Sequence, residues 1–163
     1  MKLLISAVVI AAVSAGSALA ENAKPGWGIQ FRQDTFDKTL FPISMMQQEG
    51  DQFDKSMVGF ACGIDGNLVS FFQTGMISLD SAAKVQFRDG DATTEVTFTK
   101  LDVPNFGARL AVDGKVAAEL SAIFERAAGS DVPFRTGSKQ GAFSSIGATK
   151  TFEILKQNCP AKS

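Results

Sequence analysis

Apolar and polar residues alternate along most of the first two thirds of the chain, with the period of two that a half-buried β-strand requires. In residues 27–32, for example, Trp27, Ile29 and Phe31 share one face and polar side chains occupy the other. Comparable apolar patterns predict further strands at residues 41–48, 56–64, 67–75, 83–88 and 94–101, and a less regular one at 105–112. The pattern therefore predicts six or seven strands.

Two short polar segments between these runs have the composition of tight turns. Asp65-Gly66 separates the apolar runs 56–64 and 67–75, and an Asp-Gly connection between two such runs is a strong hairpin signal because Gly accepts a positive φ. Residues 89–93, with the sequence DGDAT, supply a second turn of this kind. Both connections favour antiparallel pairing.

The period changes after Asp113-Gly114. Residues 115–129 carry apolar side chains at spacings of three and four and end at Gly129, which predicts a helix. Residues 130–147 are expected to be a loop with a short strand at 142–146. A second helix is expected at 148–159, stopped by Pro160. Strands followed by two helices in the C-terminal half indicate an α+β fold with a mainly antiparallel sheet.

Residues 1–20 have the layout of a secretory signal peptide. Lys2 precedes an apolar stretch, and small residues lead to Ala18-Leu19-Ala20, after which cleavage is expected. A membrane anchor is the alternative, but the apolar run is shorter than the roughly 20 residues that a spanning helix needs. We expect residues 21–163 to form one α+β domain in the periplasm or outside the cell, without membrane insertion after cleavage.

The charge pattern argues against nucleic acid as a partner. The chain has 16 basic and 17 acidic residues and a net charge of −1, and no basic cluster could neutralise a row of phosphates. The same lack makes an anionic membrane surface an unpromising partner. Fourteen Phe and no Tyr favour a buried aromatic core over a wet aromatic binding face.

The chain contains no histidine. This excludes Ser-His-Asp and Cys-His catalysis, histidine-ligated metal sites, and the commonest general base near neutral pH. No catalytic, cofactor-binding or metal-binding residues are assigned from the sequence, and a non-enzymatic role is favoured, while an enzyme that uses carboxylates alone stays open.

The two cysteines are far apart, at Cys62 in an early strand and Cys159 near the end of the chain. An even cysteine number in an exported chain indicates a disulfide. Redox catalysis usually needs two thiols close in sequence, and a metal site needs more ligands than two sulfurs. We predict a Cys62–Cys159 disulfide that clamps the last helix onto the first hairpin.

Acidic clusters are the main candidates for chemistry. Asp89, Asp91 and Glu95 resemble a calcium loop in spacing, but the glycine required at the sixth position is missing, and a polar turn explains them better. The remaining candidates are two carboxylate pairs that could supply the acid and the base of a glycoside hydrolase: Asp34 with Asp37, and Asp51 with Asp54.

The segment FRTGSKQGAF, between the two predicted helices, carries two basic residues and a serine. Arg135, Ser138 and Lys139 resemble a phosphate-binding loop only superficially, because the required order of glycines and lysine is absent, and a Ser138–Lys139 dyad would have side chains that point apart. A solvated loop is expected. Its flanking residues Phe134 and Phe143 could form a partner-binding edge, but core placement is the commoner fate.

Several motifs together resemble the exported family of type VI secretion-associated TagO or VasI proteins. These are Trp27 at the mature start, the strand cysteine followed by NLVSFF, the segment VQFRDGD, a helix such as AAELSAIFERA, and GAFSSIGATKTFEILKQNC. The resemblance covers most of residues 21–163 and implies a small periplasmic accessory protein without assigned catalytic residues. It marks Trp27, Cys62, Arg88 and Cys159 as signature positions.

Three functions remain open on the sequence. The first is a non-enzymatic periplasmic accessory or binding protein whose partner belongs to the envelope or a secretion system. The second is an envelope hydrolase that uses carboxylates alone, and the third is an inhibitor of an envelope-active enzyme.

Overall fold

A computed structural model of the chain describes residues 25–34, 36, 38–48, 55–63, 65–75 and 81–159. The described part contains two helices, α1 (Gly114–Ala127) and α2 (Ala148–Asn158). Its strands are β1 (Ile29–Gln33), β2 (Leu40–Gln47), β3 (Ser56–Cys62), β4 (Leu68–Thr74), β5 (Ala82–Asp89), β6 (Ala92–Val103), β7 (Gly107–Asp113), β8 (Asp131–Thr136) and β9 (Lys139–Ser144). The expected signal peptide lies outside the described residues.

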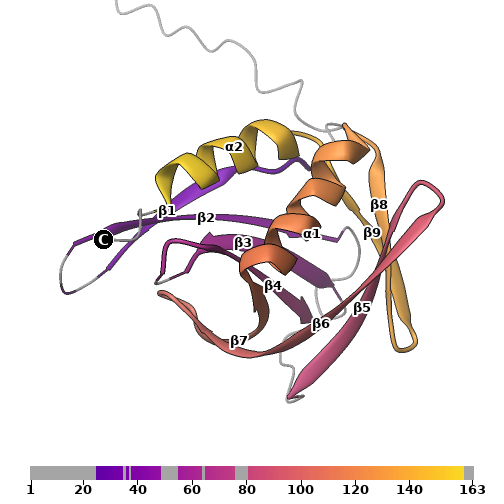
Figure 1. Cartoon of the computed structure of the whole chain (residues 1–163), viewed down its shortest axis with the longest axis horizontal. Helices are drawn as coiled ribbons and strands as arrows, with labels where there is room; N and C mark the ends of the chain where they lie inside the picture. The colour runs from indigo at the N-terminus through magenta and orange to yellow at the C-terminus, as the bar shows by residue number, and fades with distance from the viewer. Residues whose placement is uncertain are drawn as a thin grey trace, which may run out of the picture.

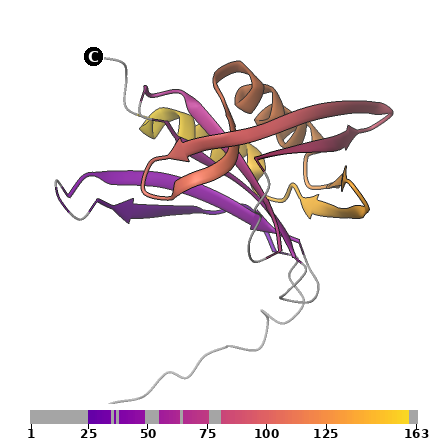
Figure 2. The ribbon, with the colours of Figure 1, turned by 90° about the horizontal axis from the view of Figure 1, so that it is seen from below.

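All nine strands belong to one sheet, in the order β1-β2-β3-β4-β7-β6-β5-β8-β9. Every neighbouring pair is antiparallel. Both helices lie on the same side of this sheet (Figure 1), and β1, in indigo, forms its outer margin (Figure 2). The predicted α+β class, the antiparallel sheet and the two helices in the C-terminal half are confirmed.

The predicted number of strands is wrong. Residues 130–147, expected to be mostly loop, contain the hairpin of β8 and β9. Pro133 and Gly137 suggested a loop, yet Gly137 lies in the hairpin turn, and the pairing of β8 with β5 covers only Arg135 and Phe134 and stops before Pro133. A proline without an N–H is tolerated where no ladder bond is required.

The main core fills the space between the sheet and the helices. Alternate residues of each central strand point to the helices, and ring contacts connect distant parts of the chain, such as Phe60 with Phe152 at 4.6 Å and Trp27 with Phe124 at 5.0 Å. Helix α1 contributes a buried stripe of Ala117, Leu120, Ser121, Ile123 and Phe124. Phe134 and Phe143 are therefore core residues and do not form an exposed binding edge.

A second, smaller core lies on the sheet face opposite to the helices. Its fully buried members are Ile43, Ala61, Val69, Phe71, Val103 and Ala111. Phe106, in the turn between β6 and β7, stacks on Phe71 with ring centroids 5.7 Å apart. Strands β3 and β4 consequently bury side chains on both faces, which explains their nearly continuous apolar sequences.

Trp27, just before β1, is hydrogen-bonded to the segment at the end of β9, so it joins the first strand of the sheet to the last. Its backbone N–H donates to Ile146 O at 2.7 Å, and its indole Nε1 donates to Ser144 O at 2.8 Å. The hydroxyl of Thr151, on α2, donates to Trp27 O at 3.2 Å. The ring is buried against Phe124 and Phe152, with centroid distances of 5.0 and 4.9 Å. Trp27 therefore has a structural role.

Neither helix in the described part of the chain has the length and hydropathy that a bilayer-spanning segment requires.

Candidate functional site

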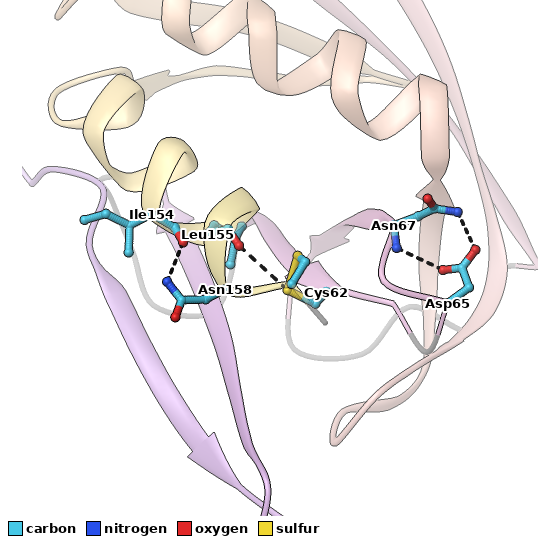
Figure 3. Close-up of a disulfide and its surroundings, with 7 residues drawn as sticks. Cys62, Asp65, Asn67, Ile154, Leu155 and Asn158 are labelled. Carbon is cyan, nitrogen blue, oxygen red and sulfur yellow. Dashed lines mark hydrogen bonds between the residues drawn. A yellow bond between two sulfur atoms is a disulfide. The ribbon is translucent and has the colours of Figure 1, made fainter. Parts of the chain in front are cut away.

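The two cysteines lie at the meeting point of β3 and α2. Cys62 is the last residue of β3, Cys159 directly follows α2, and their sulfur atoms are 2.13 Å apart, at disulfide-bonding distance (Figure 3). Cys62 is 1% exposed, and its sulfur also contacts Leu155 O at 3.9 Å. The pair is therefore placed to hold the last helix against the sheet, in the way that the sequence predicts.

The turn next to Cys62 is the expected hairpin connection. Gly63 N–H donates to Asn67 O at 2.7 Å, and the Asp65 carboxylate accepts hydrogen bonds from the backbone N–H and the side-chain amide of Asn67 (Figure 3). Asp65 thus shapes the turn that leads from β3 into β4.

The carboxylates proposed for hydrolysis do not form a site in the described residues. Asp34 lies in the turn after β1, where its carboxylate accepts a hydrogen bond of 2.7 Å from Phe36 N–H. Asp37, Asp51 and Asp54 lie outside the described residues. No acid and base pair can be built from Asp34 alone.

The acidic residues around the β5–β6 turn are engaged mainly in ion pairs. Asp89 accepts from Arg126 of α1, with an Nη2–Oδ2 distance of 2.6 Å, and Glu95 lies 3.7 Å from Lys84 Nζ. Glu95 also accepts a hydrogen bond of 3.2 Å from Gln86 Nε2. Over the described ranges, no three acidic or cysteine side chains gather as a metal ion would require.

An open groove of about 630 Å³ lies over β5, β8 and β9. It is lined by Gln86, Phe87, Arg88, Thr93, Pro133, Phe134, Arg135, Gln140 and Gly141. Val85 and Phe87 are buried toward the helices, so the alternate residues Gln86 and Arg88 point to the opposite face of the sheet. The groove therefore lies mainly on the face that the helices leave open.

Strand register brings the two arginines of the groove together. Gln86 on β5 faces Arg135 on β8, and Arg88 follows two residues after Gln86 on the same face. Arg88 and Arg135 are then diagonal neighbours, which lie roughly 7–8 Å apart on adjacent antiparallel strands. On β9, Gln140 faces Arg135 and completes a polar row.

Neither arginine of the groove has an acidic partner among the described residues. Both side chains are exposed, and no described carboxylate comes within ion-pairing distance of them. The two nearest acidic residues along the strands, Asp89 and Glu95, are occupied by Arg126 and Lys84. The result is a groove with two uncompensated positive charges, two amide side chains and the Thr93 hydroxyl. Such a set binds anions and hydrogen-bond acceptors.

Sequence reasoning selected Arg88 but treated Arg135 as part of a solvated loop. Arg135 instead belongs to β8 and points into the groove, whereas Ser138 lies in the two-residue turn and Lys139 begins β9. The only available signal was the alternation of Val132 and Phe134 with Pro133 and Arg135, which Pro133 obscured. Comparisons of the chain with protein-family models, with curated proteins and with solved structures find no match.

Proposed function

We propose that the chain is an exported, non-enzymatic accessory protein of the envelope that binds an acidic segment of a protein partner in the Arg88/Arg135 groove. The observation that carries this proposal is the pair of arginines on adjacent strands that line one groove and have no acidic partner in the described chain. The expected signal peptide and the cysteine pair at bonding distance support export. The resemblance to TagO or VasI proteins supports a secretion-system component as the partner.

The spacing of the arginines favours one kind of ligand. Alternate residues of an extended peptide lie roughly 6.6–6.8 Å apart, close to the separation of diagonal neighbours in a sheet. A segment with carboxylates at positions i and i+2 therefore places one carboxylate near each guanidinium. Arg binds carboxylates through two parallel hydrogen bonds, which adds geometric selectivity to charge attraction. Gln86 and Gln140 can hydrogen-bond the peptide groups between the two acidic residues.

Site-specific cross-linking in cells tests the proposal. A photo-reactive amino acid replaces Gln140 in the groove, and a matched control replaces Lys150 on exposed α2, on the other side of the sheet. We expect one dominant adduct from position 140 that disappears in the Arg88→Gln/Arg135→Gln background, and no such adduct from position 150. An adduct at position 140 that is unchanged in the double variant contradicts the role of the arginines.

A further inference from the structure

Strand β1 is an open edge of the sheet. Asp34 N–H donates to Thr39 O at 2.8 Å, so even-numbered residues of this strand bond toward β2 and odd-numbered residues direct their N–H and C=O groups outward. Phe31 is one of the odd-numbered residues, so its partner Pro42 needs no N–H to bond with β1. At Trp27 the outward groups bond to Ile146 and Thr151, but from Ile29 onward no partner is found among the described residues.

The β1–β2 hairpin also carries most of the exposed large apolar side chains. Phe31, Phe36 and Leu40 are 54%, 95% and 58% exposed, and only Val116 and Ile146 join them in the described part of the chain. Because Gln33 faces Leu40 and Phe31 faces Pro42, both Phe31 and Leu40 project from the face on which the helices lie. An edge strand with exposed apolar residues is a surface that natural sheets usually protect.

The usual protection is missing from β1. Charged side chains blunt many edges, but the one charge of β1, Arg32, is held over the Phe106 ring, with its Cζ 4.4 Å from the ring centre. No proline or break interrupts the strand, IQFRQ. The edge is therefore ready to accept another strand.

The sequence of β1 is complementary to itself in the antiparallel direction. A two-fold axis at Phe31 places Phe31 opposite its own copy, Gln30 opposite Arg32, and Ile29 opposite Gln33. This register pairs two aromatic rings directly and makes the two Arg32 residues diagonal neighbours, whereas an axis at Arg32 would place two guanidinium groups directly opposite each other. We propose that the occupant of the β1 edge is the β1 strand of a second copy of this chain, which makes a continuous sheet across a symmetric dimer.

The proposal is independent of the arginine groove, because β1 and the strands β5, β8 and β9 occupy opposite ends of the strand order. Sedimentation velocity across a concentration series of the exported protein measures the association. We expect a monomer–dimer equilibrium that Gln33→Pro weakens at least tenfold, since that N–H points outward and is not needed for pairing with β2. The matched control is Phe36→Lys, which changes the most exposed phenylalanine outside the strand and should leave association unchanged.

Cysteine cross-linking tests the register. Directly opposed residues have Cα atoms about 5.5 Å apart, within reach of a disulfide. We expect Phe31→Cys to cross-link to itself, Gln33→Cys not to do so, and a mixture of Ile29→Cys and Gln33→Cys chains to form a mixed dimer. A chain that stays monomeric at about 1 mM, or a cross-linking pattern with another register, overturns the proposal and leaves the edge to a strand of a different protein.

Discussion

The ring of Phe71 lies directly over Gly59, its cross-strand partner on β3. A Cβ at position 59 would lie 2.1 Å from Cζ of that ring, a distance at which something must move. Phe71 is itself 1% exposed and stacks on Phe106, so it has little room to retreat. The glycine is thus part of the packing of the second core.

Gly59→Ala should accordingly destabilise the protein. Overpacking a filled site costs about 1–3 kcal/mol in the free energy of unfolding, and urea denaturation measures that loss. The matched control is Gly28→Ala, because a Cβ at position 28 meets nothing within 4 Å. Equal stabilities of the two variants would show that Phe71 does not hold this position.

Trp27→Phe removes the indole hydrogen bond to Ser144, together with part of the buried ring volume. The variant keeps an aromatic ring against Phe124 and Phe152 but leaves Ser144 O without its indole donor, which should cost about 1–3 kcal/mol. Circular dichroism is the appropriate probe of unfolding, because this variant lacks the only tryptophan and therefore its fluorescence signal. Phe36→Leu, at a 95% exposed position, should change stability by less than about 0.5 kcal/mol. A Trp27→Phe variant as stable as that control would remove the proposed role of the indole.

The cysteine pair leads to two predictions, one about the redox state of the exported protein and one about its free energy of unfolding. Intact mass of the exported, unreduced protein should be two hydrogens below that of the reduced chain. The bond closes a loop with a sequence separation of 97, for which chain entropy gives at most on the order of 4–5 kcal/mol. Cys62→Ala/Cys159→Ala should therefore lower the free energy of unfolding by several kcal/mol. Two free thiols in the exported protein, or unchanged stability, would contradict the clamp.

Much of the fold was predictable from period alone, because strands such as β5 and β6 place Val85, Phe87, Val96 and Phe98 on one buried face. The strand expected at 142–146 overlaps β9, but β8 was missed because Pro133 and Gly137 are turn residues in most contexts, and its pairing with β5 makes this segment part of the sheet. Tertiary context decided the conformation there.

The arginine groove was only half predictable. Arg88 followed from the resemblance, but its position beside Arg135 depends on β8 returning to pair with β5 after α1, and no local pattern encodes that long-range pairing. The ion pair that occupies Asp89 was equally hidden, since Arg126 comes from a helix far along the chain. Sequence patterns predicted elements well, whereas the charge balance of a surface depended on which elements became neighbours.

A salt series separates charge attraction from other binding in the groove. If the two arginines hold carboxylates at an exposed surface, the affinity for an acidic ligand should fall as ionic strength rises, because added ions screen such pairs over about 8–10 Å at physiological salt. Titrations at several salt concentrations measure this trend. An affinity independent of salt would indicate that the ligand is held by other contacts.

The central claim is that Arg88 and Arg135 together bind acidic side chains spaced two residues apart. The direct test is fluorescence anisotropy with a labelled synthetic peptide of alternating Glu and Ser, compared with a peptide of alternating Gln and Ser. We predict that only the Glu peptide binds, and that Arg88→Gln/Arg135→Gln weakens it by about tenfold or more, since hydrogen bonds to charged groups contribute about 1.5–3 kcal/mol each. The control Arg109→Gln/Lys150→Gln removes the same charge from exposed sites outside the groove and should bind as the unmodified chain does. Equal loss in both double variants, or equal binding of the Gln peptide, would contradict the claim.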